Sequence, residues 1–496
     1  MQMSESVSIS PLTGNSYIIP KNKRDDNLKT FLKKNKSKKI IVVMGLGFVG
    51  SVMSIVCANS EYEDYAVIGL DLKNKNSYWK IASINENKFP VVSSDPKIKK
   101  YFDKTRKKNN FYATYDVGSL KYANIIIIDI NLDVSKIKND KKDLVDFDVP
   151  MKNFKSAVND IANNCKENAL ILTETTIPPG TSKKIILPII KEVFKKRNLD
   201  FNKLSIGHSY ERVMPGPHYI DSIKNFYRVY SGINKKSADK VEKFLRTIIN
   251  TRNFPLTRLK NTESSEMAKV LENSFRAMNI SFIVEWSRFA EKASVNIYEV
   301  VDAIRQRPTH ANLMYPGIGV GGYCLTKDPL IASWASKKIY KSNEGLYFSE
   351  KAVENNDKMP IYCYKFIKKI IKEKEKKINN IALLGVAYAP GIGDTRFSPV
   401  DGLYELLKKD KYKISCHDPY LDFWDEKSIL IENNIIAFLR KKFDMIILST
   451  GHEIYKRFKF EKYIKNDPII IDTIGIINTN KYINRKNVYT LGVGNQ

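Results

Sequence analysis

The sequence predicts an α/β protein in which two doubly wound sheets flank a central helical region. Three observations favour this fold class. Short apolar runs typical of buried strands alternate with helical stretches after residue 39 and again after residue 376. A glycine-rich turn follows the first strand of each region, at residues 45–50 and 385–393. Between the two regions, residues 263–295 show the apolar spacing of one long amphipathic helix.

The first glycine turn predicts a dinucleotide site. An apolar strand, residues 40–44, leads into Gly45-Leu-Gly47-Phe48-Val49-Gly50 and then into a helical pattern. In this motif the first glycine permits a tight turn, the second lets backbone amides approach a pyrophosphate, and the third allows close helix–strand packing. The next strand ends at Asp71, where a carboxylate would bind a ribose diol and repel a 2′-phosphate. We therefore expect a Rossmann-like domain that binds NAD, through residues 45, 47–50 and 71. The alternative is a glycine-bearing βαβ unit without a ligand.

Four segments follow from the alternation of patterns. We predict a mobile N-terminal extension over residues 1–38 and an NAD-binding Rossmann domain over residues 39–256. A central helical domain, residues 257–375, would carry the long helix, and an α/β domain, residues 376–496, would complete the chain. The fold prediction is thus two Rossmann-like doubly wound domains joined by a central helical domain.

Composition narrows the function classes. The chain has 496 residues, of which 43% are hydrophobic, so it can bury sizeable cores. Its formal net charge of +28 raises the possibility of a nucleic-acid partner. The lysines are instead spread along the whole chain, and the sequence has no arginine-rich or aromatic-interleaved basic module. We therefore expect no nucleic-acid partner.

Cysteines and apolar runs bear on the compartment. The five cysteines are dispersed without a CxxC pair, which argues against a disulfide framework or a metal site and favours a reducing compartment. The apolar runs are short, and residues 1–38 lack the apolar core of a signal peptide. We expect a cytoplasmic protein with no membrane association and no bound metal.

Six motifs, taken in order, carry a family resemblance. They are GLGFVG, TTIPPGT, YERVMPG, a Lys-x3-Asn pair on the long helix, GVGGYCLTKDP, and GVAYAP followed by DTRFSP. Together they resemble the UDP-glucose/GDP-mannose dehydrogenase family over residues 39–480. The resemblance implies an NAD-dependent nucleotide-sugar 6-dehydrogenase with a UDP-sugar as substrate. It also implies a homodimer or higher homo-oligomer.

The resemblance implies roles for individual residues. The catalytic set comprises Cys324, Lys269, Asn273, Glu211, Asp328 and Thr176, and Thr176 also lies near the cofactor. The substrate-binding set comprises Glu211, Arg212, Lys269, Asn273, Arg305, Gly321, Gly322, Tyr388 and Arg396. Without the shared motifs several of these residues have plainer interpretations. A lone cysteine usually packs in a core, and Arg305 would be an ordinary surface arginine.

The chemistry explains why such an enzyme needs these residue types. Oxidation of a sugar hydroxymethyl group to a carboxylate takes two hydride transfers with an aldehyde between them. A thiolate at Cys324 would hold the aldehyde as a thiohemiacetal, which the second oxidation turns into a thioester for hydrolysis. Lys269 and Asn273 are suited to stabilising the oxyanions. Glu211 or Asp328 could serve as the general base, and the sequence leaves both open.

Three segments depart from the family pattern. Asp129, Ile130 and Asn131 end a strand where Val-Pro-Thr-Pro is common, which puts one cofactor contact in doubt. Ala389 and Ile474 stand where lysine and arginine are frequent, so two cationic substrate contacts are missing unless Arg396 and other basic residues compensate.

The loop YERVMPG is similar to the branch that acts on UDP-N-acetylhexosamines. We therefore favour such a sugar, for surface polysaccharide or glycan synthesis, over UDP-glucose. A different class, a catalytically silent nucleotide-sugar-binding protein, is the second alternative.

Overall fold

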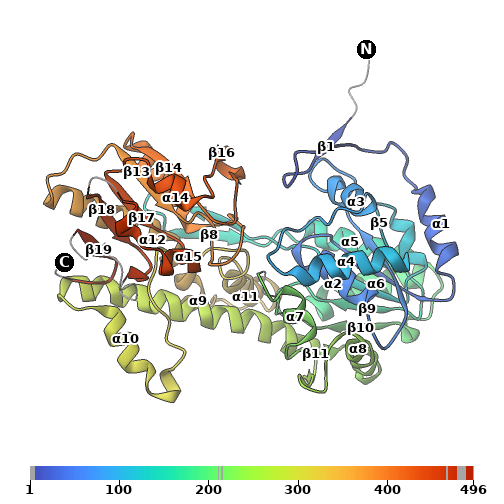
Figure 1. Cartoon of the computed structure of the whole chain (residues 1–496). Helices are drawn as coiled ribbons and strands as arrows, with labels where there is room; N and C mark the ends of the chain where they lie inside the picture. The colour runs from blue at the N-terminus through green and yellow to red at the C-terminus, as the bar shows by residue number, and fades with distance from the viewer. Residues whose placement is uncertain (1–5, 211, 214–215, 465–466, 478–486, 495–496) are drawn as a thin grey trace, which may run out of the picture. The chain divides into compact units, whose positions relative to one another are not determined.

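The computed structural model describes residues 6–210, 212–213, 216–464, 467–477 and 487–494, and it divides into two compact units (Figure 1). Unit 1 comprises residues 1–135, 148–270 and 334–343, and unit 2 comprises the rest. Each unit contains a mainly parallel sheet with helices, so the predicted α/β class is confirmed.

Unit 1 is built on an eight-stranded sheet with the order β12-β11-β10-β9-β6-β3-β4-β5. All neighbours run parallel except β10 and β11. The strands are β3 (Lys39–Met44), β4 (Tyr65–Leu70), β5 (Phe111–Thr114), β6 (Ile125–Ile128), β9 (Leu170–Thr173), β10 (Ser205–His208), β11 (Val229–Gly232) and β12 (Thr257–Arg258). From β3 the chain proceeds through β4 and β5 to one edge of the sheet and then continues on the other side of β3 with β6. In open α/β sheets, ligands bind at the carboxyl ends of the strands where the order changes direction in this way.

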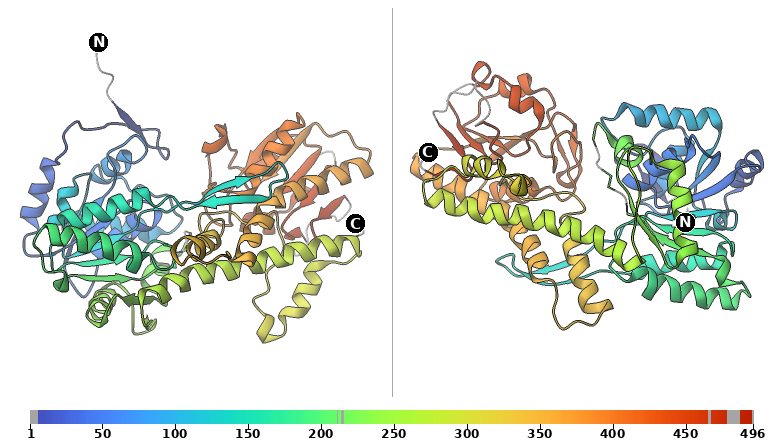
Figure 2. Two further views of the ribbon diagram at one scale, coloured as in Figure 1. Left: turned by 180° about the vertical axis from the view of Figure 1, so that it is seen from behind. Right: turned by 90° about the horizontal axis from the view of Figure 1, so that it is seen from below.

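Helices cover both faces of this sheet (Figure 2). They are α2 (Phe48–Ala58), α3 (Tyr78–Asn85), α4 (Pro96–Lys108), α5 (Lys152–Asn164), α6 (Leu187–Lys196), α7 (Tyr219–Lys224) and α8 (Lys235–Ile248). Local chemistry sets where they begin. Asp95 accepts from the amide of Lys97 at the start of α4, and Asn234 accepts from that of Ser237 at the start of α8. The branched side chains of β3 and β6 are buried on both faces of the sheet, which explains their continuous apolar runs.

The segment that precedes β3, which the sequence predicts as a mobile extension, contains regular secondary structure in its described part. Its described part forms a two-stranded hairpin, β1 (Val7–Ile9) and β2 (Ser16–Ile18), and the helix α1 (Asp26–Lys34). Tyr17, Leu28 and Phe31 are buried within unit 1. In the structure, residues 6–38 are therefore attached to the domain through packing and hydrogen bonds that the sequence pattern did not reveal.

Unit 2 contains a five-stranded, all-parallel sheet with the order β14-β13-β17-β18-β19. The strands are β13 (Asn380–Leu384), β14 (Lys413–His417), β17 (Met445–Leu448), β18 (Ile469–Asp472) and β19 (Val488–Thr490). Its helices include α12 (Tyr347–Glu373), α13 (Pro399–Lys409), α14 (Ile435–Leu439) and α15 (Glu453–Arg457). Two hairpins, β7 (Ser135–Lys138) with β8 (Leu144–Asp148) and β15 (Phe423–Trp424) with β16 (Ile429–Leu430), complete the strands that the structure describes.

The long helix of the sequence prediction is α9 (Thr262–Lys292), with 31 residues. Its first turns belong to unit 1 and the rest, from Leu271, to unit 2. The shorter α10 (Ile297–Arg305) and α11 (Asp328–Trp334) follow in unit 2. The region predicted as a central domain is thus shared between the compact units.

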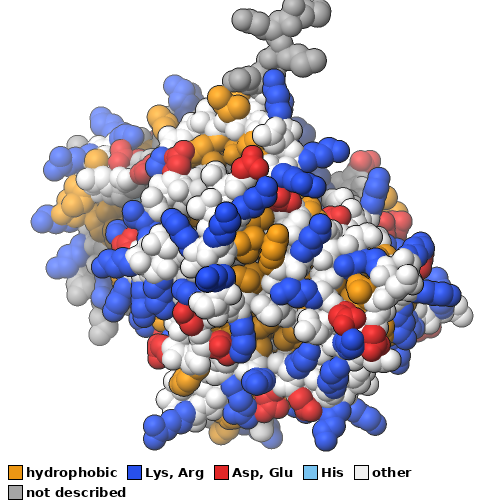
Figure 3. Space-filling view, turned by 90° about the vertical axis from the view of Figure 1, so that its right-hand side faces the viewer, with side chains coloured by type: hydrophobic (Ala, Val, Ile, Leu, Met, Phe, Trp, Pro, Cys, Tyr) orange, Lys and Arg blue, Asp and Glu red, His pale blue; other side chains and the backbone are white. Residues whose placement is uncertain are grey.

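On the face that the space-filling view shows (Figure 3), positive charge is distributed rather than gathered. Figure 3 shows lysine and arginine side chains scattered over the whole visible face, with fewer acidic groups among them. Within the described residues, no helix combines the length and apolarity that a membrane crossing requires.

Candidate active site

The three motif glycines of unit 1 have three different surroundings. Gly45 has a φ of +100°, and a Cβ there would lie 2.5 Å from the carbonyl oxygen of Asp129. A Cβ on Gly50 would overlap the carbonyl oxygen of Gly45. At Gly47, by contrast, a Cβ would meet nothing within 4 Å. The first and third glycines are therefore required by the protein itself, and only Gly47 leaves open space for a ligand.

Gly47 is the N-cap of α2, and no side chain caps this helix end. Phe48 and Val49 form its first turn, and the Phe48 carbonyl oxygen accepts from the Tyr219 hydroxyl over 2.7 Å. The first amides of a helix have no partner within the helix and favour an anion. The open space and the helix end together fit a pyrophosphate.

Asp71, which directly follows β4, is bound on both of its carboxylate oxygens. The amides of Leu46 and Leu72 donate to it over 3.0 and 2.7 Å. Lys80 on α3, which the sequence reasoning did not single out, places its Nζ 2.7 Å from Oδ2. Asp71 is thus held in place by the glycine turn and by one ammonium.

A cavity of 720 Å³ opens over these groups. Gly45, Gly47, Asp71 and Lys80 are among its lining residues, as are Asp129, Ile130 and Asn131 at the end of β6. The departures from the usual Val-Pro-Thr-Pro therefore do line the cavity. Its size, the glycine cradle and the acid fit a dinucleotide with a ribose diol at Asp71.

Thr176 lies in the TTIPPGT loop after β9 and is buried. The loop is held by Glu266 of α9, a residue that the sequence reasoning also missed. Its carboxylate accepts from the amides of Gly180 and Ser182 over 2.6 and 2.9 Å. Burial raises the pKa of Glu266 to about 7, and the two amide donors oppose this rise.

Lys269 lies three residues further along α9 and is also buried. Its Nζ is 5.5 Å from the centre of the Tyr210 ring. Burial and then the charge of Lys269 lower the pKa of His208 to about 3, so this histidine is neutral at physiological pH. Its Nδ1 lies 2.8 Å from the Ser265 hydroxyl.

Arg212 follows Tyr210 in the YERVMPG loop. Its guanidinium donates to the Tyr210 hydroxyl over 3.2 Å and lies over the Phe226 ring. Glu211, the predicted base, lies outside the described residues, as does Pro215 of the same loop.

Cys324 in unit 2 differs from the other four cysteines. It is exposed, whereas Cys57, Cys165, Cys363 and Cys416 are buried. Burial raises the pKa of each buried thiol, to about 11 for Cys165 and about 12 for Cys416. Among the five cysteines, all of which belong to the described part of the chain, only Cys324 is exposed, as expected of a nucleophile.

Asp328 lies four residues after Cys324 and is fully buried at the start of α11. Its carboxylate accepts from Nδ2 of Asn273 over 2.6 Å, and Nζ of Lys327 lies 3.0 Å away. The Lys327 ammonium also lies over the Tyr323 ring. The structure thus brings two predicted residues, Asn273 and Asp328, into direct contact.

The glycines before Cys324 pack against protein. A Cβ on Gly321 would approach the Tyr388 Cβ to 2.6 Å, and one on Gly322 would approach the Tyr388 ring equally closely. Gly322 also has a φ of +79°. Burial, and then the charges of Asp394 and Cys324, raise the pKa of Tyr388 to about 12. These glycines let Tyr388 pack onto the cysteine loop.

Two predicted substrate arginines have partners of their own in unit 2. Arg396 forms a two-pronged ion pair with Asp394, with distances of 2.9 Å from Nε and 2.6 Å from Nη2. Arg305 donates from Nε to the carbonyl of Ala311 and lies over the Tyr315 ring. At the departure position, the Ile474 side chain lies near Gly317 and Gly451.

The second sheet repeats the glycine-and-acid pattern with a different outcome. Asp418 follows β14 as Asp71 follows β4, but it is fully buried. It accepts from the amides of Val386, Ala387 and Tyr420, and Nε2 of His452 lies 3.1 Å away. Unlike Asp71, which lines an open cavity, Asp418 is closed off from solvent by the groups bonded to it, so this acid fixes the turn.

Three family models match the chain. They are the NAD binding domain, the central domain and the UDP binding domain of the UDP-glucose/GDP-mannose dehydrogenase family, at residues 39–249, 263–358 and 382–479. The chain belongs to this family. It is an NAD-dependent nucleotide-sugar dehydrogenase, and the sequence-based prediction of cofactor and reaction class is confirmed.

Individual relatives agree with this assignment. A UDP-N-acetyl-D-mannosamine dehydrogenase of Methanocaldococcus jannaschii is 28% identical, over 94% of this chain and 99% of its own. One of Pyrococcus horikoshii is 29% identical over 88% of this chain and 96% of its own. A solved structure of UDP-D-ManNAc dehydrogenase from Pyrococcus horikoshii superimposes with a TM-score of 0.74 at 26% identity, covering 91% of this chain and 99% of that one.

Proposed function

We propose that this dehydrogenase oxidises C6 of a UDP-N-acetylhexosamine to a carboxylate. Two observations together carry the proposal. Cys324 is accessible, and the chain matches UDP-N-acetyl-D-mannosamine dehydrogenases over nearly the whole length of those relatives. The YERVMPG loop, which is similar to that of the N-acetylhexosamine branch, favours the same sugars. UDP-glucose remains the competing substrate.

In the proposed reaction, the C6 alcohol loses a proton to a base and a hydride to bound NAD. The Cys324 thiolate would then add to the aldehyde carbon, which gives the alkoxide of a thiohemiacetal. Loss of a second hydride from C6 to another NAD would turn this alkoxide into a thioester. Water would cleave the thioester and release the carboxylate, the thiolate and two protons. The cofactor supplies only the two hydride acceptors.

We assign distinct tasks to the two candidate acids. Asp328 already accepts from Asn273 and pairs with Lys327, so it is suited to orienting the Asn273 amide toward an oxyanion. That leaves Glu211 as the base that activates water. Lys269 would supply the second oxyanion partner, and one such donor is commonly worth about 10²–10³ in rate. Thr176, in the loop fixed by Glu266, would lie near the reacting centre and the cofactor.

The substrate-binding residues of this proposal are those that the family resemblance implies. Arg212, Gly321, Gly322, Tyr388 and Arg396 would contact the UDP-sugar, with Arg305 contributing to phosphate or sugar. Ala389 and Ile474 carry no charge, so the proposed pose relies less on cations than the usual family pattern.

We also propose a homodimer or higher homo-oligomer that works in the cytoplasm and supplies uronic acids for surface polysaccharide or glycan. The oligomer is supported by an apolar stripe along α9, whose members are 46–62% exposed: Leu271, Phe275, Phe282, Trp286 and Phe289. Contiguous exposed apolar side chains of this size mark association surfaces. A reducing compartment agrees with five dispersed cysteines that include no CxxC pair.

The test is NADH formation with UDP-N-acetylmannosamine, UDP-N-acetylglucosamine, UDP-glucose and GDP-mannose. We expect the highest kcat/KM with an N-acetylhexosamine and two NADH per sugar consumed. A Cys324→Ser variant should bind NADH normally and lose the complete oxidation. Preference for UDP-glucose would refute the sugar assignment. Tight UDP-sugar binding without NADH formation would instead support the silent binding protein.

A further inference from the structure

The N-terminal clamp, which we define as residues 6–38, lies outside the matched family models. The first match begins at residue 39. In the structure the clamp comprises β1, β2 and α1 and is packed on unit 1. One group of its contacts lies on the β4–α3 segment, residues 71–80, which leads from the ribose-side acid into α3. Another group lies on β5 and the residues beside it.

Ser8 of β1 is the closest link between the two segments. Its hydroxyl is fully buried, donates to the carbonyl oxygen of Lys75 over 2.7 Å and accepts from the amide of Trp79 over 3.0 Å. One hydroxyl therefore satisfies two backbone groups within the β4–α3 segment. These groups lie in and beside a turn that has no ladder or helix partner for them, so the bonds define its shape.

Two further bonds reinforce this attachment. Tyr17 of β2 accepts at its hydroxyl from Ser83 of α3 over 3.1 Å. Lys73 donates to the carbonyl oxygens of Lys21 and Asn22 over 3.3 and 2.9 Å. The clamp thus bonds to the turn before α3, to α3 itself and to the side chain of Lys73.

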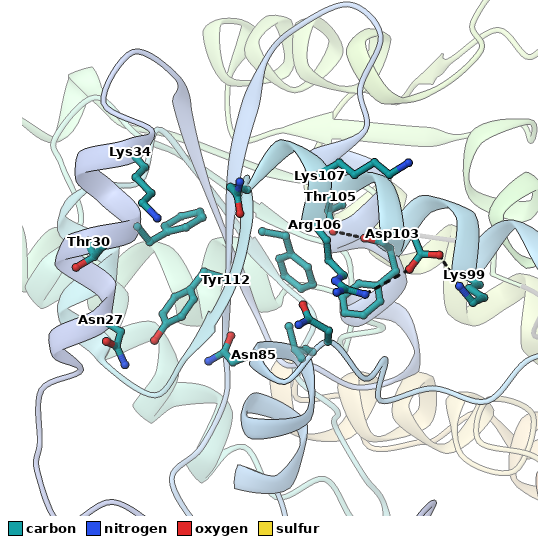
Figure 4. Close-up of a pocket in the computed structure, with 16 residues that line it drawn as sticks. Asn27, Thr30, Lys34, Asn85, Lys99, Asp103, Thr105, Arg106, Lys107 and Tyr112 are labelled. Carbon is teal, nitrogen blue, oxygen red and sulfur yellow. Dashed lines mark hydrogen bonds and ion pairs between the residues drawn. The ribbon is translucent and has the colours of Figure 1, made fainter.

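The clamp is itself anchored to the edge of the sheet. The Asp25 carboxylate accepts from the hydroxyls of Tyr112 and Thr114 of β5, over 2.9 and 2.7 Å. Phe31 of α1 stacks on the Tyr112 ring with 5.5 Å between the centres. Figure 4 shows α1 beside β5, with Thr30 and Lys34 facing an open groove of 860 Å³.

The held segment is one wall of the NAD cavity. Leu72, Lys73, Asn74, Ser77 and Lys80 all line it, next to Asp71. We propose that the N-terminal clamp is a positioning element for the adenosine side of NAD, acting through Ser8 on the β4–α3 segment and through Tyr17 on the helix α3 that continues it. When only a fraction of molecules holds the binding-competent wall, the apparent Kd rises by the inverse of that fraction.

The experiment measures NADH binding by fluorescence titration, together with hydrogen exchange of the amides of residues 72–80. In Ser8→Ala and in Ser8→Ala/Tyr17→Phe we expect the Kd for NADH to rise about fivefold, with faster exchange in this segment. The KM for NAD should rise in proportion, while kcat and the KM for the sugar stay unchanged. Thr30→Ala, on the groove-facing side of α1, is the matched control and should behave as wild type.

A structural role alone would lower the melting temperature of the variants and leave the Kd for NADH unchanged, and this result would overturn the proposal. Tyr17→Phe removes one hydroxyl from a retained ring, so it tests the proposal if the double variant does not fold. Because NADH binding is measured without sugar, the outcome does not depend on the substrate proposed above.

Discussion

Nδ2 of Asn273 donates to Oδ2 of Asp328 over 2.6 Å, while Nζ of Lys327 lies 3.0 Å from the other carboxylate oxygen. The carboxylate is fully buried, so both partners offset the cost of keeping a charge away from water. This geometry makes Asp328 the group that orients the Asn273 amide, and it binds the helix α9 to the cysteine loop within unit 2.

The first prediction concerns this pair. Asp328→Asn and Asn273→Ala should each lower kcat about 10²-fold, because each removes or misorients one oxyanion partner. The kcat of the double variant should be close to that of the slower single variant, since both changes remove the contribution of the oriented Asn273 amide. Asp302→Asn, at an exposed aspartate of α10, serves as control. Fully additive losses in steady-state kinetics would contradict the orienting role.

Selective alkylation tests the accessible thiol. Brief treatment of the folded protein with iodoacetamide should modify Cys324 and spare the four buried cysteines, whose thiols burial also keeps protonated. Mass spectrometry of tryptic peptides gives the site and the extent. Cys324→Ser should take up no label, and modification of Cys165 or Cys363 at a comparable rate would show that the burial described here is incorrect.

Glu266 makes stability depend on pH. Its pKa rises from 4.5 to about 7 on folding, so between these values the folded state holds a proton that the unfolded state releases. The contribution of Glu266 protonation to the free energy of unfolding is therefore present in full below pH 4.5. It is lost as pH rises toward 7, by up to about 3 kcal/mol. Glu266→Gln should flatten that part of the curve in urea unfolding at several pH values. If the difference in free energy of unfolding between Glu266→Gln and the wild type stays constant from pH 4.5 to 7, the raised pKa of Glu266 is contradicted.

Two glycine substitutions should have opposite consequences. Gly50→Ala should prevent correct folding, because its Cβ overlaps the Gly45 carbonyl oxygen. Gly47→Ala should fold, since its Cβ enters open space, and should weaken NADH binding at least about tenfold by occupying the place of the pyrophosphate. Circular dichroism reports folding and fluorescence titration reports binding. If Gly47→Ala folds and binds NADH with normal affinity, the cavity at Gly47 is not the site of the NAD pyrophosphate.

The apolar stripe of α9 predicts an oligomer interface. Trp286 is 46% exposed and packs edge-on against Phe289. Trp286→Glu should shift sedimentation toward the monomer, because it places a charge in the middle of the stripe. Ile454→Glu, at an apolar residue of α15 with 39% exposure, is the matched control. A wild-type protein that sediments as a monomer would rule out the interface.

Local sequence patterns were sufficient for the dinucleotide fold. The strand–glycine–helix–strand–acid order around Gly45 and Asp71 depends on contacts close in sequence, and the structure places these residues along one cavity. The same reasoning found the long helix and separated Cys324 from the other cysteines. The second acid, Asp418, shows the limit, because the same pattern there leads to a buried structural carboxylate.

The sequence alone determined the fold class after residue 39 and the cofactor class, and it predicted Cys324 as the reactive thiol, because periodicity and short motif spacing encode local geometry. Only the tertiary structure decided which groups meet. It showed that Gly321 and Gly322 accommodate Tyr388, that Glu266 holds the TTIPPGT loop, and that residues 6–38 are bonded to the wall of the NAD cavity. Each of these contacts joins residues at least 51 positions apart. Such partners are chosen by the packing of whole elements, which no local pattern records.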